Sequence, residues 1–496
     1  MRAGAFTLIA AAALVPACLR TGPGSCGGDL PSDPGCRCPD GGLDAGPEPD
    51  AGPARRGGRV VIRVEDEPTT LLSLAAPGGI VRRIVDHDVQ QSLVRYDFAT
   101  GTPAPELASR WEMSADGRMY VFHLDPAAQW HDGRPVTATD VAFTFGWIAD
   151  PAGGCAKGAD FTDVASVEAR DTATVAIALD RPRPDFLAAL DAVPILPSHV
   201  FGKNSIPSHP AARAPVGSGP LRFVRWDKGR AIVLERNPLW KGPAPFVDSV
   251  EYRVVRDRRV AIDLLRRGDV DIVPDLDGAP LPASADWRTR TYPLPGVEAW
   301  ICATSRPFCS DPGVRTALAR LIDRDAVRCS VMGCNAGAAR AFPPPRFNPR
   351  GARGLLEAAG WVDRDGDNVR DKGGARLALT LILPDGRRSY ESEAELVRED
   401  MAASGVEVNV LLVDESTYAE RLRRRAFDVT IATVDGSSGT AAAFDPGREG
   451  LAVVAATFAP RAFALVRHRV HGLVVRDGRV EATRLWVSPS PRGGNP

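Results

Sequence analysis

Two stretches of alternating apolar residues late in the chain constrain its fold more than any other feature. Leucine alternates with other residues in 377–383, and valine and leucine do so in 406–412, which is typical of β-strands. Residues 391–404 between them predict a helix, and a second helix near 417–425 precedes a third strand-like run at 427–431. A strand, a helix and a strand in this order predict a right-handed parallel crossover. An α/β lobe with helices flanking an open sheet is therefore expected.

The folded region begins with a similar alternation of element types. Residues 59–64 predict a strand, and apolar residues at helical spacing follow in 81–93. Residues 119–124 predict another strand, after which Thr137 and Asp140 form a capping-box pattern ahead of an apolar run. The chain of 496 residues exceeds what one hydrophobic core usually holds, so we expect several lobes with mixed sheets.

The N-terminus carries an export signal. A basic Arg2 and an apolar run over residues 3–15 precede Val15-Pro16-Ala17-Cys18. This end is similar to a bacterial lipobox, which predicts a signal peptide over 1–17 and a lipid on Cys18. Because Pro16 is not favoured in a lipobox, the alternative is ordinary cleavage near Ala17, with Cys18 as a thiol or disulfide partner. No later stretch is apolar enough to span a membrane, so membrane attachment would rest on the lipid.

Residues 18–57 are expected to form a disordered tether. They are dominated by Gly, Pro, Asp, Ser and Cys, with few large apolar residues to offset chain entropy. Such a segment would hold a binding domain clear of a membrane.

The eight cysteines that follow Cys18 suggest disulfides, because the chain is expected to be exported. The close pairs Cys302 with Cys309 and Cys329 with Cys334 are the preferred bridges, since each closes a short loop. The remaining four leave their connectivity open: Cys26, Cys36, Cys38 and Cys155.

Charge and motif content exclude several functions. The 61 basic and 62 acidic residues nearly cancel, so no charge field draws the molecule to nucleic acid. No nucleophile or third catalytic group accompanies His131 and Asp132. The acidic run 363–371 lacks the glycine and the bidentate acid of a calcium loop, and the seven histidines are scattered. We therefore expect no catalytic residues, no cofactor and no bound metal.

Nine separated blocks of the chain form a recognisable series. In chain order, they are residues 105–112 (PELASRWE), 120–124 (YVFHL), 130–141 (WHDGRPVTATDV), 215–220 (PVGSGP), 235–240 (ERNPLW), 268–272 (GDVDI), 314–318 (VRTAL), 355–361 (LLEAAGW) and 363–367 (DRDGD). The most specific block is Trp130–Val141. Together these blocks resemble the large oligopeptide, dipeptide and nickel-type periplasmic solute-binding proteins of ABC transporters, known as family 5.

The resemblance implies a periplasmic-binding-protein-like fold: two hinged α/β lobes with an extra inserted domain. The first domain would be discontinuous, and the third lobe would close over the ligand by hinge motion. The expected boundaries are a first domain in three parts (58–104, 214–292 and 451–487), a second domain inserted at 105–213, a third lobe at 293–450 and a tail at 488–496.

Family members of the peptide-binding kind hold extended peptide backbone and meet its amino terminus with an acidic residue, which the resemblance assigns here to Asp435 or Asp445. Trp300 is a candidate wall of the cleft, although a tryptophan at such a position more often belongs to the core. Residues 441–458 are shorter and richer in alanine than the family pattern, so the third lobe is expected to be shortened.

The resulting hypothesis is a monomeric, lipid-anchored receptor outside the cytoplasmic membrane that captures a small peptide-like solute and delivers it to an ABC permease. It is not expected to be an enzyme. The alternative is a non-transport sensing or scaffold lipoprotein with a degenerate cleft on the same fold.

Overall fold

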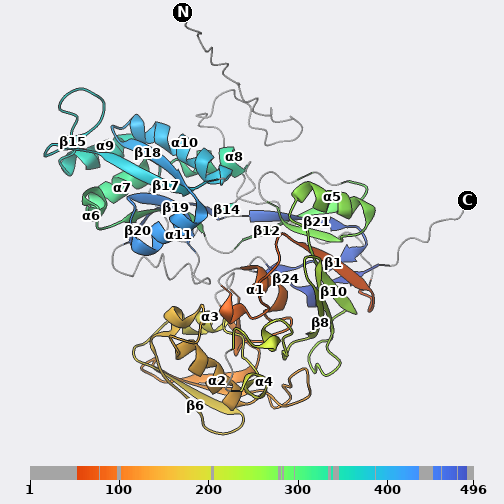
Figure 1. Ribbon diagram of the computed structural model, residues 1–496. Coiled ribbons are helices and arrows are strands. Elements are labelled where there is room, and N and C mark those ends of the chain that lie inside the picture. The colour runs from red at the N-terminus through yellow and green to blue at the C-terminus, as the bar shows by residue number, and fades with distance from the viewer. Residues whose placement is uncertain are drawn as a thin grey trace, which may run out of the picture.

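The protein forms three bodies, each with a β-sheet. The computed structural model describes residues 53–76, 79–97, 102–202, 206–276, 281, 284–294, 297–332, 337–338, 346–385, 387–434, 451–459, 461–476 and 479–488. The three large sheets among them have seven, six and four strands. Figure 1 shows the six-stranded and four-stranded bodies apart from one another, each beside the seven-stranded body.

The first domain is built on the seven-stranded sheet, whose strands come from three separate parts of the chain. The central strand β1 is buried over five of its six residues and runs parallel to both neighbours, β10 and β11. Helices α1 (Gly79–Val85) and α5 (Arg258–Arg267) accompany the sheet. The strand order is β12 (Trp287–Pro293), β21 (Arg461–Arg467), β11 (Ile272–Leu276), β1 (Arg59–Val64), β10 (Ser249–Val254), β9 (Ala231–Arg236), β8 (Leu221–Asp227).

The second domain is an antiparallel four-stranded sheet with helices, inserted after a short hairpin of β2 (Val94–Asp97) and β3 (Thr102–Pro105). Thr137 and Asp140 form the capping box expected at the start of α2. The sheet order is β4 (Ala108–Met113), β5 (Met119–Leu124), β7 (Thr174–Leu179), β6 (Val164–Ala169), and the helices are α2 (Ala138–Ala149), α3 (Phe186–Leu190) and α4 (Ser198–Phe201).

The third lobe is a three-layer α/β body. Strands β17 and β18 are parallel, as expected of the crossover, and β17 also runs parallel to β19. Core residues of α7 to α10 pack on one face of the sheet, and Tyr418 of α11 packs on the other. The strand order is β14 (Gly337–Ala338), β20 (Leu451–Ala459), β13 (Val297–Ala303), β19 (Val429–Val434), β17 (Ala378–Pro384), β18 (Glu407–Val413); the helices are α6 (Pro307–Ser310), α7 (Pro312–Arg320), α8 (Arg324–Met332), α9 (Pro349–Ala358), α10 (Arg388–Ala402) and α11 (Glu415–Arg424).

One expected boundary needs correction. Residues 451–459 are expected in the first domain, yet they form β20, which pairs with β13 inside the third-lobe sheet. The chain returns to the first domain only at β21. Both segments are apolar strands, so their composition carries no sign of which sheet each one joins.

Short elements complete the chain. Hairpin β15 (Asp371–Lys372) and β16 (Ala375–Arg376) projects from the third lobe. Near the C-terminus, β22 (Val470–His471) pairs with β25 (Trp486–Val487), and β23 (Val475–Arg476) pairs with β24 (Arg479–Val480).

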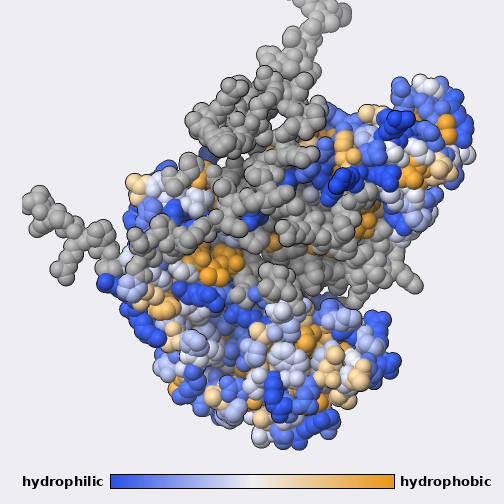
Figure 2. Space-filling model, turned by 180° about the vertical axis from the view of Figure 1, so that it is seen from behind, coloured by the Kyte–Doolittle hydropathy of each residue, from blue (hydrophilic) through white to orange (hydrophobic). Residues whose placement is uncertain are grey.

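On the face seen from behind, the described residues are largely hydrophilic, with apolar residues among them (Figure 2). Within the described residues, every helix is too short or too polar to cross a bilayer.

Candidate functional site

The chain passes between the first domain and the third lobe twice, and both connections lie at the carboxyl edge of the third-lobe sheet. Strands β17, β18 and β19 end there. Because β13 is antiparallel to β19, its first residue Val297 pairs with Val434 at the same edge, and Phe458 near the end of β20 pairs with Glu298. Ligands of open α/β sheets bind at this end of the strands. The topology therefore directs the usual ligand edge of the third lobe toward the first domain.

Glu298 is a buried acidic group at this edge. Its side chain is 7% exposed, and Oε1 accepts a hydrogen bond from Thr433 Oγ1 at 3.0 Å, whereas Oε2 has no hydrogen-bond partner among the described residues. Burial raises the pKa of Glu298, although hydrogen bonding to Tyr390 and Thr433 and the charge of Arg387 act in the opposite direction. A buried carboxylate oxygen that lacks a donor carries a desolvation cost that a bound cation would relieve.

Helix α10 supplies polar groups beside Glu298. Arg387, directly before the helix, lies over the ring of Tyr390 at 5.2 Å, and its Nη1 donates to the Tyr390 hydroxyl at 3.2 Å. Burial and the charge of Glu298 raise the pKa of Tyr390 well above its usual value. The edge thus combines a carboxylate, a phenol and a guanidinium, a set suited to a zwitterionic ligand.

Trp300 lies in the core of the third lobe and not at the surface of this edge, which corrects its assignment as a cleft wall. The side chain is 1% exposed in the core of the third lobe, and Nε1 donates to Glu393 Oε1 at 2.8 Å. Glu393 is fully buried, and burial together with the charge of Glu298 raises its pKa to about 8. Trp300 therefore acts as a donor that supports a buried carboxyl group.

Two of the predicted ligand-binding residues fall outside the described residues. Asp435 follows Val434, the last residue of β19, and Asp445 comes later in the same undescribed stretch. Cys18 also lies outside the described residues, so the predicted lipidation stays a prediction.

The disulfide predictions have different outcomes. Cys302 and Cys309 form a disulfide with a Cα–Cα distance of 6.0 Å, as the spacing predicted. Cys329 is half-buried on α8, and its predicted partner Cys334 lies outside the described residues. That pairing stays a prediction.

A second polar cluster fixes the junction between the first and second domains. His87 Nδ1 lies 2.8 Å from Glu106 Oε1, and Nε2 lies 3.5 Å from Asp191 Oδ1. Arg82 pairs with Asp86 at 3.0 Å. These residues come from α1 and the turn after it, from the start of the second domain and from the end of α3. The cluster therefore holds the first and second domains together.

His131 is held in place as a structural residue. Gly217 N donates to its Nδ1 at 3.1 Å, and Nε2 lies 3.1 Å from the carbonyl oxygen of Gly219. Burial lowers its pKa to about 4, so the ring is neutral and joins the family-like block at 130–141 to the turn at 215–220.

Sequence reasoning missed Glu298, Glu393 and the His87 junction. A signal for Glu298 existed, because it is the one charged residue in the apolar run Val297–Ala303. A lone charge in a fully buried strand needs a partner. Glu393 and His87 gave no such signal, because both stand among polar neighbours.

The first domain is a discontinuous α/β domain into which the second domain is inserted. The third lobe is joined to it by two adjacent connections. This is the architecture of a hinged solute-binding protein. Residues 102–445 match the family model described as bacterial extracellular solute-binding proteins, family 5 Middle. The chain belongs to this family of solute-binding proteins.

Known relatives agree with this assignment. The oligopeptide-binding protein AppA of Bacillus subtilis is 27% identical over 404 residues, which cover 76% of this chain and 73% of that protein. Its solved complex with a nonapeptide has a TM-score of 0.65 at 21% identity, covering 88% of this chain and 100% of that chain. The ABC transporter substrate-binding protein CtaP of Listeria monocytogenes has a TM-score of 0.71 at 20% identity, covering 87% and 100%.

Proposed function

We propose that the protein is the receptor of an ABC transporter and captures a small peptide-like solute between its third lobe and its first two domains. The single observation that carries this proposal is the buried, half-satisfied carboxylate of Glu298 at the edge from which both crossings leave the third lobe. The name of AppA, an oligopeptide-binding protein, supports the same ligand class.

In this proposal the ligand's ammonium group meets acidic groups of the third lobe. Glu298 Oε2 offers one acceptor, and Asp435 or Asp445 offers the second. Arg387 would meet a carboxylate or carbonyl of the ligand. Closure of the hinge would then exclude water and strengthen these contacts.

The protein acts by binding, delivers its solute to a membrane permease, and works as a monomer anchored through a lipid on Cys18. The segment 18–57 would provide the reach from the membrane. His131 accepts a hydrogen bond from the 215–220 turn, and Asp132 pairs with His199. These structural contacts support a non-catalytic role for both residues.

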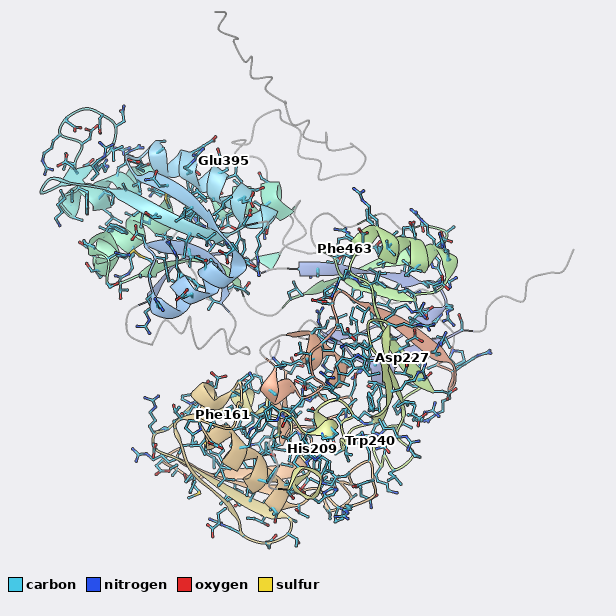
Figure 3. The ribbon with its side chains drawn as sticks, viewed as in Figure 1. Phe161, His209, Asp227, Trp240, Glu395 and Phe463 are labelled. Carbon is cyan, nitrogen blue, oxygen red and sulfur yellow. A yellow bond between two sulfur atoms is a disulfide. The ribbon has the colours of Figure 1, made fainter. Side chains whose placement is uncertain are left out.

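The test is thermal unfolding of the protein from residue 53 onward against di- to hexapeptides, amino acids, sugars and nickel chelates. Binding to the folded state raises the midpoint. We expect peptides to raise it and Glu298→Gln to reduce their effect. The matched control is Glu395→Gln, an exposed acid on α10 paired with Arg398 (Figure 3).

A shift from only one other solute class would replace the peptide assignment. No shift with any compound, on protein that unfolds cooperatively, would contradict the receptor proposal and favour the sensing or scaffold alternative.

A further inference from the structure

Apart from the proposed solute site, a pocket lies on the first domain at the end of β8. It has a volume of about 520 Å³, within the range of small-molecule sites. Asp227, which ends β8, is on the part of the first domain that is away from the third lobe (Figure 3). This pocket is therefore distinct from the proposed solute site.

The floor of the pocket is apolar and aromatic. Phe223 and Trp226 of β8 line it together with the buried Pro68. The indole of Trp226 is fixed, because Nε1 donates to Glu67 Oε1 at 2.9 Å. A fixed ring at the wall of a pocket offers a flat surface on which a planar group can stack at low entropic cost.

The rim of the pocket is basic. Four cations line it: Arg213, Arg225, Lys228 and Arg256. Arg225 pairs with Asp227 at 2.9 Å and Arg256 pairs with Asp66 at 3.0 Å. Arg213 lies over the Trp226 ring at 5.9 Å, and neither it nor Lys228 makes an ion pair within the described part of the chain. Arg213 and Lys228 thus stand at an aromatic floor without a salt bridge to any described carboxylate.

Glu67 is the one acid in the lining, and its charge is already engaged. Oε1 accepts from Trp226 Nε1 and from the Gly229 backbone N–H at 2.7 Å. The pKa of Glu67 is lowered, first by the Gly229 hydrogen bond and also by Trp226 and the charges of Lys228 and Arg256. Glu67 therefore stays ionised as a support for the indole, and Arg213 and Lys228 are the two cations of the rim that make no salt bridge among the described residues.

We propose that this pocket binds a small anion that carries a planar apolar group, an aryl carboxylate or aryl phosphate. Guanidinium and ammonium groups recognise carboxylate and phosphate oxygens, and the ring of Trp226 with Phe223 stacks on the aryl part. The pocket joins Arg213, at the end of the second-domain segment, to Trp226 and Arg256 of the first domain. An occupant therefore bridges the two domains and stabilises their junction.

The experiment uses the full chain, with phenyl phosphate, benzoate, inorganic phosphate and phenol as probes, and measures binding by calorimetry and the unfolding midpoint. We expect an aryl anion to bind more tightly than phosphate or phenol alone. The comparison of benzoate with phenyl phosphate tells which anionic group is preferred.

The double variant Arg213→Gln/Lys228→Gln should weaken aryl-anion binding by roughly tenfold or more. The control is Arg259→Gln, an exposed arginine on α5 outside the pocket, which should bind as the parent does. Peptide-induced stabilisation should be the same in all three proteins, so this proposal and the solute-receptor proposal can fail independently.

Equal binding by the double variant and the control would overturn the proposal. Binding of inorganic phosphate as tight as that of phenyl phosphate would also overturn it, because the aromatic floor would then contribute nothing.

Discussion

Nδ1 of His87 lies 2.8 Å from Oε1 of Glu106, and the two side chains are only 5% and 8% exposed. The pair joins the first domain to the second. Burial alone would lower the pKa of His87, but the charge of Glu106 and hydrogen bonds to Asp191 and Glu106 outweigh it and raise the pKa to about 9. The imidazolium is therefore part of the folded structure at neutral pH.

This pair predicts a loss of stability in mild alkali. The folded pKa lies above the unfolded value of about 6.5, so the stabilisation is complete below about pH 6.5 and is lost as pH rises toward 9. We expect His87→Asn to remove roughly 3 kcal/mol at pH 6 and to flatten the profile above it. Asparagine suits this position, because His87 has a φ of 64°. Urea unfolding from pH 6 to 9.5 measures the effect, and parallel profiles for parent and variant would contradict it.

Glu393 predicts a second pH dependence of the free energy of unfolding, at lower pH than the one predicted for His87. Its pKa is raised to about 8, so the carboxyl group is neutral in the folded protein at pH 7. Stability is greatest below the unfolded pKa of about 4.3 and falls as pH rises toward 8. Glu393→Gln keeps an acceptor for Trp300 and should increase the free energy of unfolding at pH 8 by about 2 to 4 kcal/mol. The exposed Glu395→Gln should change it by less than about 0.5 kcal/mol; equal effects would refute the assignment.

A side chain at Gly217 would collide with the backbone at Val89, and this predicts a loss of stability on substitution. A Cβ atom there would lie 1.8 Å from the carbonyl oxygen of Val89, a backbone atom that cannot rotate away. We expect Gly217→Ala to cost about 2 to 4 kcal/mol. Gly146→Ala, in the interior of α2 with nothing within 4 Å, should instead gain about 0.5 to 1 kcal/mol. Thermal melts of both variants test the contrast, and similar shifts would show that the close contact is absent.

The Cys302–Cys309 disulfide, with a sequence separation of 7, should contribute about 2 to 3 kcal/mol through loop closure. The double variant Cys302→Ala/Cys309→Ala should lose that amount in guanidinium unfolding. Cys155→Ala serves as the control, since no disulfide involves Cys155 in the described structure. An unchanged midpoint for the double variant would show that the bridge does not form in solution.

The parts of the fold that sequence could predict are those governed by local patterns. The crossover of β17, α10 and β18 follows from alternation and helical spacing, and the α2 capping box follows from Thr137 and Asp140. Sheet membership is different, because it depends on contacts between distant segments. Nothing within Leu451–Ala459 distinguishes a neighbour of β13 from a neighbour of β12.

The site was predictable to a smaller extent. The ligand edge follows from strand direction once the crossover is known, but Glu298 becomes a candidate only when Thr433 is seen beside it. Trp300 shows the reverse case. Its residue type suits a cleft wall, yet the strand that carries it is buried on both faces, so only the three-dimensional arrangement places it in the core.

The position of β21 between β11 and β12 bears on the order in which the protein folds. The second-domain sheet has all its strands by Leu179 and the third-lobe sheet by Ala459, whereas the first-domain sheet needs residues 461–467. Until they are available, β12 has no neighbour in that sheet. Pairings between such distant segments form slowly. The first-domain sheet is therefore the last of the three to gain all of its strands as the chain is synthesised.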